Sequence, residues 1–291
     1  MRLATRGSAL ALVQAGLARQ ALLDVHPDLA VDLLEVSTRG DGLVDVSLEA
    51  AEGIGFFTDA LEVALDEGEA DLAVHSLKDL PTDIPPRFAL AAVLPREDPR
   101  DVLVSRHGGL DDLPRGARVG TDSARRRAQL ALRRPDLDFQ PVRGNVPTRL
   151  RKLDAGEFDA LVLAAAGLQR LGLTDRLGHP LEPEVCLPAP GQGAIVLEAL
   201  AQGEWLELAR PVSDASTVAA VTAERACLAA LGGGCQSAMG ALATVAGDRL
   251  TLEALLVDAG RALRVVVEGS SGRPAACGEE AAARLLKLRD G

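Results

Sequence analysis

The chain has 291 residues, which is enough for two or three domains of ordinary size. Apolar residues make up 47% of it but aromatic residues only 2%. Cores of Leu, Val and Ala are therefore expected, and aromatic stacking platforms for sugars or single-stranded nucleic acid are not. A formal net charge of −11, from 31 Lys and Arg against 42 Asp and Glu, repels a phosphate backbone and argues against a nucleic-acid partner.

The sequence holds four cysteines, which are Cys186, Cys227, Cys235 and Cys277. They form no Cys-x-x-Cys pair, so neither a zinc site nor a disulfide framework is indicated. Gln14 interrupts the apolar character of the stretch SALALVQAGLA, and Arg19 follows it directly. The stretch is therefore interpreted as a helix capped by Ser8 rather than an export signal. No stretch approaches the length of a membrane span. A cytoplasmic protein without a membrane partner is expected.

The first eighty residues predict strands that alternate with helices. A short strand at the N-terminus is followed by a helix from Ser8 to near Pro27, and the apolar run 29–41 suits a buried parallel strand that ends in a loop. Residues 55–70 then predict an amphipathic helix, and DLAVHSLKD (71–79) a strand that runs into a polar loop. This alternation is typical of an α/β architecture.

Two segments of the chain repeat. LDEGEADLAV (65–74) matches LDAGEFDALV (153–162), and each contains a helix end, a glycine and an Asp before an apolar strand. Likewise ATRGSA (4–9) after the first strand is echoed by GTDSAR (120–125), with a Ser that can cap a helix. The two repeats indicate two successive domains that share one fold.

Pro-rich and charged residues at 94–105 and the segment LPAPGQGAIVLEAL (187–200) are interpreted as outward and return crossovers between these domains. The expected fold class is α/β, with two similar doubly wound domains joined by a double crossover and a small α+β domain at the C-terminal end. The expected boundaries are 1–94 with 193–211, then 99–187, then 213–291. In such a body, ligands bind at the carboxyl ends of strands, in the cleft between the domains.

Arginines cluster at the expected strand-to-helix turns, namely Arg6, Arg125, Arg126, Arg143 and Arg149. The helix N-termini there offer free N–H groups, and a guanidinium matches the oxygens of a carboxylate or phosphate. Solvated surface charge is the alternative, and it fits Arg133 and Arg134 well. No phosphate-binding Gly-x-x-x-x-Gly-Lys motif is present, so a ligand with several carboxylates fits better than a nucleotide.

Two loops carry residues of types that act in catalysis or in covalent attachment. Lys78 and Asp79 lie together in HSLKDLP (75–81), which is either a polar turn with an incidental ion pair or a site where a carboxylate stabilises a developing cation. Cys235 lies in GGGCQ (232–236), after three glycines. It is either a small buried hydrophobe after a helix stop or a thiol at a place where a bulky group approaches the backbone.

Several of these stretches resemble the hydroxymethylbilane synthase (porphobilinogen deaminase) family along nearly the whole chain. The matching stretches, in order, are ATRGSALALVQA, HSLKDLPT, PREDPRDVLVS, VGTDSARRRAQL, RGNVPTRLRKLDAGEFDALVLAAAGLQRLGL, LPAPGQGA and GGGCQ. The resemblance implies a transferase of porphyrin and heme biosynthesis that joins four porphobilinogen molecules head to tail, releases ammonia each time and yields linear hydroxymethylbilane. It further implies a monomer that builds the chain on a dipyrromethane primer, bound through a thioether to Cys235.

The resemblance also assigns roles to residues of this sequence. Asp79 matches the catalytic carboxylate, which also contacts the cofactor. The other cofactor-binding positions are Cys235, Lys78, Ser123, Arg125 and Arg126. The substrate-binding positions are Arg6, Ser8, Gln14, Phe57, Arg143, Arg149, Arg170 and Gln192.

Three positions depart from the family pattern. Ile54 and Asp59 stand where lysines are common, in a loop that retains Phe57, which puts any electrostatic role of that loop in doubt. Asp122 replaces a serine and adds negative charge beside an expected anion-binding turn.

Two other functions compete with the synthase. A non-catalytic two-lobed binding protein for a polycarboxylate, like the periplasmic binding proteins in fold, would need neither a loop thiol nor Asp79. A cysteine hydrolase pairing Cys235 with His75 lacks a matched His–Asn or His–Asp context.

Overall fold

The computed structural model describes residues 1–37, 59–233 and 238–291. Their contacts divide the chain into two compact units, one of residues 1–97 with 194–218 and the other of residues 98–193 with 219–291. The division into three domains made from the sequence stays a prediction. Among the described residues no helix is long and apolar enough to cross a membrane.

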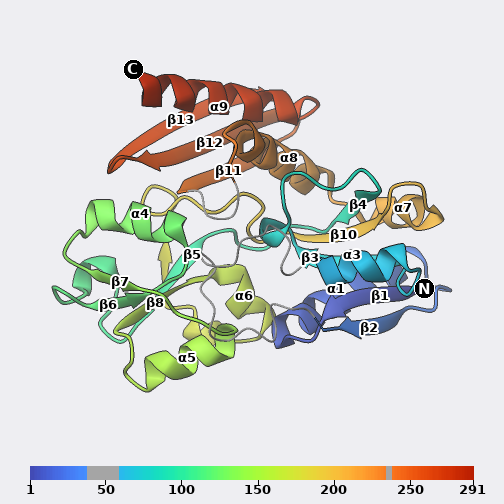
Figure 1. Ribbon diagram of the computed structural model, residues 1–291, viewed down its shortest axis with the longest axis horizontal. Helices are drawn as coiled ribbons and strands as arrows, with labels where there is room; N and C mark the ends of the chain where they lie inside the picture. Colours follow the sequence, from blue (N-terminus) through green and yellow to red (C-terminus); the bar gives the residue numbers. More distant parts are fainter. Residues whose placement is uncertain (38–58, 234–237) are drawn as a thin grey trace. The chain divides into compact units, whose positions relative to one another are not determined.

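The first unit is built on a five-stranded sheet in the order β2-β1-β3-β10-β4 (Figure 1). Its strands are β1 (Arg2–Arg6), β2 (Asp32–Val36), β3 (Leu72–Ser76), β4 (Phe88–Val93) and β10 (Ile195–Leu200). β1 runs parallel to β2 and β3, whereas β10 runs antiparallel to β3 and β4. Its helices are α1 (Ala9–Val25), α3 (Asp59–Asp66), α7 (Glu204–Ala209) and the 3₁₀ turns η1 (Leu77–Asp79) and η4 (Arg210–Val212).

Helices cover both faces of this sheet because successive strand residues point to opposite sides. Leu3 packs in one core cluster with Leu22 of α1. The next residue, Ala4, packs in a second cluster with Leu61 of α3. The unit is therefore doubly wound, as the alternation of strands and helices predicts.

One strand differs from its prediction. The run 29–41 was expected to contain a buried strand, but β2 lies at the edge of the sheet and Leu33 is 40% exposed. An edge strand pairs on one side only, so apolar residues are no guide to burial there.

The second unit contains another five-stranded sheet, in the order β7-β6-β8-β5-β9. Its strands are β5 (Asp101–Ser105), β6 (Arg118–Gly120), β7 (Asp138–Gln140), β8 (Ala160–Ala164) and β9 (His179–Leu181). Its helices are α4 (Ala124–Arg133), α5 (Val146–Asp154), α6 (Ala165–Arg170) and the 3₁₀ turns η2 (Leu110–Asp112) and η3 (Thr174–Arg176).

The two sheets share one topology. β6 runs parallel to β7 and β8, and β5 runs antiparallel to β8 and β9, just as β10 runs antiparallel to its neighbours in the first sheet. The chain leaves the first sheet after β4, enters the second at β5, and returns from β9 to β10. The predicted pair of similar α/β domains with a double crossover is confirmed.

The repeated sequence corresponds to a repeated set of contacts. The Arg2 N–H donates to Asp71 Oδ2 at 2.6 Å, and the Asp71 N–H donates back to the Arg2 carbonyl at 2.9 Å. In the second unit, the Arg118 N–H donates to Asp159 Oδ2 at 2.8 Å, and the Asp159 N–H donates to the Arg118 carbonyl at 2.9 Å. Each aspartate thus joins the start of one strand to the segment that leads into its parallel neighbour.

The ends of the helices repeat in the same way. Gly68 after α3 and Gly156 after α5 have φ angles of +66° and +79°, the left-handed conformation that glycine adopts without strain. Ser8 caps α1 by accepting the N–H of Ala11 at 3.3 Å, and Ser123 caps α4 likewise. Both expected caps are therefore confirmed.

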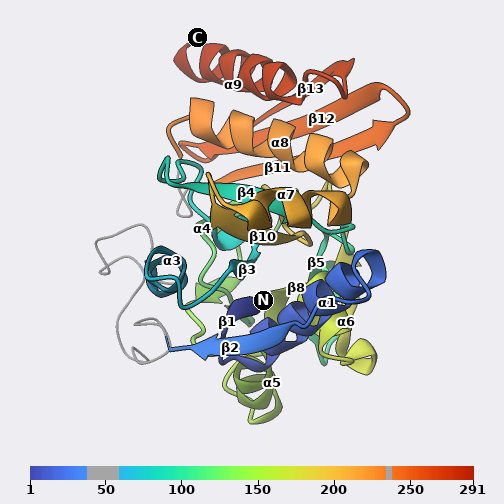
Figure 2. The same cartoon turned by 90° about the vertical axis from the view of Figure 1, so that its right-hand side faces the viewer.

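The C-terminal part of the second unit is a three-stranded antiparallel sheet, β11-β12-β13, with two helices (Figure 2). These elements are β11 (Met239–Ala246), β12 (Arg249–Asp258), β13 (Arg261–Ser270), α8 (Ala215–Ala230) and α9 (Pro274–Asp290). Leu250, Leu252 and Ala254 alternate along β12 and pack in one cluster with both helices. The predicted meander and its flanking helices are confirmed.

The close approach of α9 to α8 requires glycine at position 278. A Cβ built on Gly278 would collide with the Ala223 carbonyl oxygen and would lie 2.7 Å from the Cys227 nitrogen. Because these atoms belong to the backbone, they cannot move aside, and we expect Gly278→Ala to lower the free energy of unfolding by roughly 1–3 kcal/mol in urea denaturation. Gly16→Ala on α1 is the control, since a Cβ there meets nothing within 4 Å. That change should be neutral or stabilising by up to about 1 kcal/mol. Equal effects of the two substitutions would contradict the packing argument.

Candidate active site

Candidate residues of the first unit lie where β1 and β3 end. Arg6 is the last residue of β1, Ser8 begins the following helix, and Lys78 and Asp79 form the 3₁₀ turn directly after β3. Because β1 and β3 are parallel neighbours, their carboxyl ends meet at one edge of the sheet. This is the edge at which ligands bind in α/β sheets.

Gln14 braces this edge from within α1. The side chain is 5% exposed, and its Nε2 donates to Ser76 Oγ, at the end of β3, over 2.8 Å. One residue further on, the Leu77 N–H donates to the Ala194 carbonyl at 3.1 Å. The turn that carries Asp79 is therefore fixed on two sides.

The Asp79 carboxylate itself is available to a ligand. Asp79 is exposed, and among the described residues no hydrogen bond or ion pair reaches its side chain. Lys78, its neighbour in the turn, is half-buried. A carboxylate in this setting can accept a hydrogen bond from a ligand or stabilise a positive charge on it.

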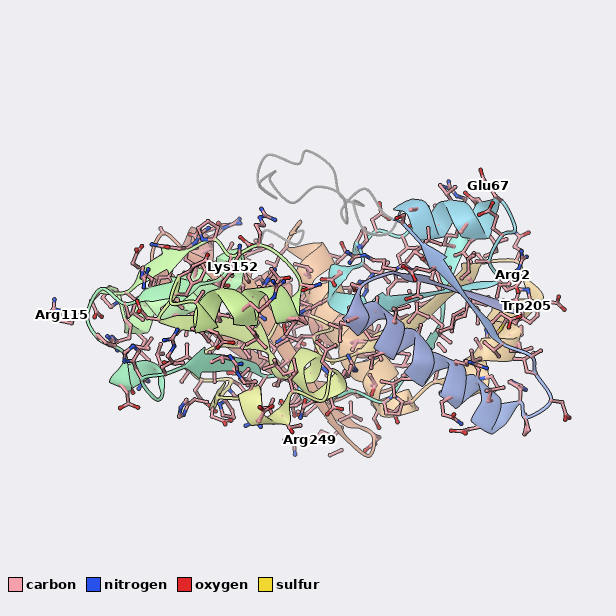
Figure 3. The ribbon with its side chains drawn as sticks, turned by 90° about the horizontal axis from the view of Figure 1, so that it is seen from below. Arg2, Glu67, Arg115, Lys152, Trp205 and Arg249 are labelled. Carbon is pink, nitrogen blue, oxygen red and sulfur yellow. The ribbon has the colours of Figure 1, made fainter. Side chains whose placement is uncertain are left out.

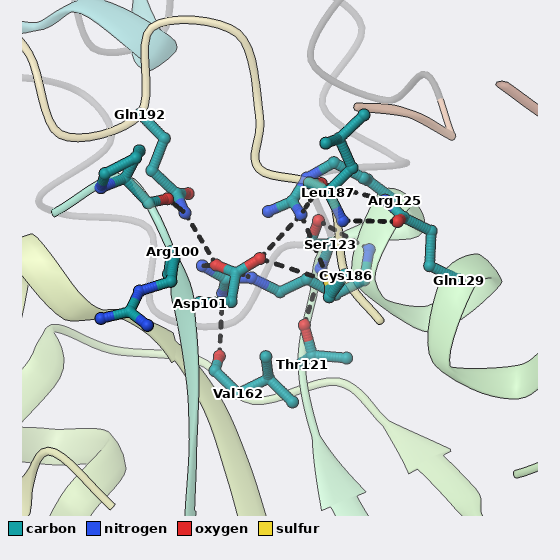
Figure 4. A network of polar contacts seen from close by, with 12 residues as sticks. Arg100, Asp101, Thr121, Ser123, Arg125, Gln129, Val162, Cys186, Leu187 and Gln192 are labelled. Carbon is teal, nitrogen blue, oxygen red and sulfur yellow. Dashed lines mark hydrogen bonds and ion pairs between the residues drawn. The ribbon is translucent and has the colours of Figure 1, made fainter. Parts of the chain in front are cut away.

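In the second unit one buried carboxylate accepts hydrogen bonds from two arginines (Figure 4). Asp101, the first residue of β5, has no exposed surface and receives Arg125 Nη1 at 2.7 Å, together with Arg126 Nη2 at 2.7 Å and Nε at 3.0 Å. Gln192 Nε2 donates to the same carboxylate at 2.9 Å. Burial acts to raise the pKa of Asp101, but the charges of the two arginines outweigh it and hold this pKa well below its usual range.

Arg125 and Arg126 are only 4% and 7% exposed. By contrast, charged side chains such as Glu67, Arg115 and Arg249 project from the outside of the protein (Figure 3). Arg125 also donates to the Leu187 carbonyl at 2.7 Å, and Arg126 to the Val162 carbonyl at 2.8 Å. The two predicted cofactor-binding arginines are thus rigidly held before any ligand is considered.

Cys186 belongs to the same network. Its Sγ donates to Asp101 Oδ2 at 3.4 Å, and burial followed by the charge of Asp101 raises the pKa of this thiol to about 12. Burial also raises the pKa of Cys227 to about 12, and Cys277 is 5% exposed. The Cys186 and Cys227 thiols therefore stay neutral near pH 7, so they are poor nucleophiles.

The remaining candidates of this unit lie after β7, on α5, at the end of α6 and in the return crossover. Arg143 and Arg149 approach Asp122, at 3.7 Å and 3.9 Å. Arg170, at the end of α6, donates from Nη2 to the Gly193 carbonyl at 2.6 Å. Gln192 is 1% exposed and also donates to the Pro99 carbonyl at 2.7 Å.

Cys235 and Phe57 lie outside the described residues, as does Ile54. The structure thus groups Arg6, Ser8, Gln14, Lys78 and Asp79 in the first unit. It groups Ser123, Arg125, Arg126, Arg143, Arg149, Arg170 and Gln192 in the second.

Two carboxylates that hold segments of the second unit together could not be predicted from the sequence. Asp101 was part of a recognised motif, but its arginine partners lie 24 and 25 residues away. Glu224 on α8 is fully buried and accepts the N–H groups of Gly191 at 2.7 Å and Ala243 at 2.8 Å. It therefore ties α8 and β11 to the crossover segment that carries Gln192.

The chain thus has two α/β units of one topology, and each carries cationic side chains near the ends of its strands, where α/β sheets bind ligands. The family model for the porphobilinogen deaminase dipyrromethane cofactor-binding domain matches residues 1–207, and the model for the C-terminal domain of that family matches residues 218–287. The chain belongs to the porphobilinogen deaminase family, whose members are transferases.

Individual relatives agree with the family match. The chain is 49% identical over 290 residues to porphobilinogen deaminase of Roseiflexus castenholzii, covering 98% of this chain and 95% of that one. It is 48% identical over 290 residues to the enzyme of Thiobacillus denitrificans, with the same coverage of both chains. Among solved structures, the BvgS VFT2 domain of Bordetella pertussis matches with a TM-score of 0.45 and 18% identity, over 73% of this chain and 85% of that one.

The buried network predicts a specific loss on removal of the Asp101 charge. Asp101→Asn leaves two buried guanidinium groups without their counter-ion, so we expect the free energy of unfolding to fall by roughly 3–5 kcal/mol in chemical denaturation. Because the folded pKa of Asp101 lies below the unfolded value near 4, its contribution is complete above about pH 4 and is lost as the pH falls further. As the pH falls below 4, the free energy of unfolding should therefore decrease less in the variant than in the wild type.

Asp111→Asn is the control for that experiment. It removes an equal charge from an exposed pair with Arg133, at 2.6 Å, and should change stability little. An Asp101 variant as stable as the Asp111 variant would show that the network contributes nothing.

Proposed function

We propose that this chain performs the reaction of its family with the residues described above. The reaction joins four porphobilinogen molecules head to tail, with loss of ammonia at each step, and gives linear hydroxymethylbilane for porphyrin and heme biosynthesis. The observation that carries the proposal is the match of both family models, which together extend over residues 1–207 and 218–287.

We assign Cys235 as the residue that bears the dipyrromethane cofactor through a thioether. The sequence supports this assignment, because Cys235 stands in the family's glycine-rich GGGCQ stretch. The other three cysteines are buried, and the pKa values of Cys186 and Cys227 are raised to about 12. A thiol that stays protonated and inaccessible is unsuited to forming the bond.

The residues of the second unit fit a cofactor that carries carboxylates. Arg125 Nε is buried and has no hydrogen-bond acceptor among the described residues, although Nη1 of the same guanidinium is saturated. A buried N–H of this kind is costly unless a ligand accepts from it. We assign Arg125, Arg126 and Ser123, with Lys78 and Asp79, to hold the cofactor. When bound, the cofactor supplies the pyrrole carbon to which the first substrate is joined.

Asp79 is assigned the catalytic role. Porphobilinogen loses its amino group in the protonated, ammonium form. The electron pair of the C–N bond leaves with the nitrogen as neutral ammonia, and the positive charge passes to the pyrrole. The exposed Asp79 carboxylate, fixed on a short turn, can stabilise this charge and accept a hydrogen bond from the pyrrole N–H. Its turn is held by the Leu77–Ala194 hydrogen bond, so little reorganisation is needed.

Substrate carboxylates are assigned to Arg6, Arg143, Arg149 and Arg170, with Ser8, Gln14, Phe57 and Gln192 in support. Arg143 and Arg149 are 29% and 25% exposed, so a substrate can reach them. Gln14 and Gln192 are buried and already donate to protein acceptors, so they act by positioning Ser76 and Asp101.

The quaternary and cellular setting is proposed on the family resemblance alone. We propose a cytoplasmic monomer whose partner is porphobilinogen, without membrane or nucleic-acid partners. The net charge of −11 supports the last point, because it repels phosphate backbones.

Neither rival function gains support from these contacts. A non-catalytic polycarboxylate-binding protein is disfavoured by membership of an enzyme family over nearly the full chain. A cysteine hydrolase would need an accessible His75, yet its imidazole is 6% exposed and lies 3.0 Å from Glu198 Oε2. Glu198 is itself fully buried.

Intact-mass spectrometry tests the attachment. The purified protein should carry an added mass equal to one dipyrromethane, and Cys235→Ser should lose both this mass and the activity, because an alcohol is a far weaker nucleophile than a thiolate. Cys277→Ala is the control and should keep both. An adduct that persists on the Cys235→Ser protein would place the attachment elsewhere.

Asp79→Asn tests the catalytic role separately from binding. The change keeps the size of the side chain but removes its charge, so turnover should fall by roughly 100-fold or more while the KM for porphobilinogen changes little. The dipyrromethane adduct should remain on Cys235. Asp83→Asn, an exposed aspartate four residues further along the chain, should leave turnover unchanged. Normal turnover in the Asp79 variant would exclude the assigned role.

A further inference from the structure

Asp122 stands between two of the proposed substrate-binding arginines. It precedes Ser123, the cap of α4, and its Oδ2 lies 3.7 Å from Arg143 Nε and 3.9 Å from Arg149 Nη2. The side chain is 13% exposed, and Oδ2 is buried and accepts no hydrogen bond from the described part of the chain. A buried carboxylate oxygen in this state is unusual, because such atoms are normally hydrogen-bonded.

Neighbouring contacts hold the aspartate and one arginine in place independently of each other. The Thr121 N–H donates to the Gln140 carbonyl at 2.9 Å, and the Ser123 N–H donates to Thr121 Oγ1 at 3.2 Å, which fixes the backbone around Asp122. Arg149 Nε donates to the Gly144 carbonyl at 2.7 Å, within its own loop. The Asp122 carboxylate and the Arg149 guanidinium therefore lie close together without a hydrogen bond between them.

The attraction between them is Coulombic and lacks the direction of a hydrogen bond. Separations of 3.7 Å and 3.9 Å are longer than a hydrogen bond but still place opposite charges close together. Asp101 differs in this respect, since it receives short hydrogen bonds from both of its arginines. An incoming carboxylate that accepts direct hydrogen bonds from Arg143 and Arg149 can therefore outcompete Asp122.

We propose that Asp122 is a built-in counter-ion that weakens the binding of ligand carboxylates by Arg143 and Arg149. Asp122 offsets part of the positive charge of the two arginines, so a carboxylate binds and also leaves again. This inference rests on the proposed function only for the identity of the natural ligand. Without Asp122, a ligand with many carboxylates would be released slowly from the two arginines. Asp122 lowers the affinity for such a ligand.

Asp122→Asn tests this idea, with Asp122→Ser as a second variant in case the amide disturbs the loop. Removing the like charge should lower the KM for porphobilinogen roughly three- to tenfold and make the rate more sensitive to salt. Calorimetric titration with propane-1,2,3-tricarboxylate should show a similar decrease in Kd, independently of turnover. Thermal melting verifies that both variants are folded.

Two controls separate the local charge from other effects. Asp111→Asn changes the net charge equally but lies in an exposed pair with Arg133, so its KM and tricarboxylate Kd should stay at the wild-type values. Adding Arg143→Leu to Asp122→Asn should abolish the gain in tricarboxylate binding.

The outcomes separate this inference from the proposed function. If both Asp122 variants leave KM and tricarboxylate Kd unchanged, or raise them, then Asp122 is no competing anion and the inference is wrong. If the wild type does not turn over porphobilinogen but Asp122→Asn still tightens tricarboxylate binding through Arg143, the proposed function fails and the counter-ion role stands.

Discussion

A carboxylate without exposed surface, that of Asp101, holds two arginines and a glutamine of the second unit in place. It opens β5, yet its hydrogen bonds come from Arg125 and Arg126 in the first turn of α4 and from Gln192 in the return crossover. The carboxylate thereby links β5, α4 and the return crossover, which lie far apart in the sequence. Breaking such a group is costly because each partner would stay buried and charged or polar. Arg125 and Arg126 are therefore held in one arrangement.

The protein uses carboxylates in three different electrostatic states. Asp101 is saturated by hydrogen bonds and serves the structure. Asp122 is close to cations but hydrogen-bonded to none of them, and Asp79 is exposed on a turn. Asp101 differs from the other two carboxylates by the donors that it receives, whereas Asp122 differs from Asp79 by lying close to two arginines. The same side chain is thus a fixed, a competing or an available anion according to its surroundings.

Local signals in the sequence sufficed for much of the fold. The caps at Ser8 and Ser123, the glycines at 68 and 156 and the repeated Asp before a strand all depend on neighbours a few residues away. Burial could not be predicted so easily, because β2 is apolar yet lies at an edge. Loop arginines were predicted to bind anionic groups, but the sequence could not show that Arg125 and Arg126 both donate hydrogen bonds to Asp101. Contacts of that kind depend on the completed sheet rather than on spacing along the chain.

The crossover has a consequence for the order of assembly. All strands of the second sheet, β5 to β9, come from the continuous stretch 101–181, whereas the first sheet needs β10, at 195–200, to join β3 to β4. During synthesis, the N-terminal sheet therefore stays incomplete until about a hundred residues beyond β4 have emerged, and β3 and β4 wait with unpaired edges. The later-made sheet is thus the first able to close.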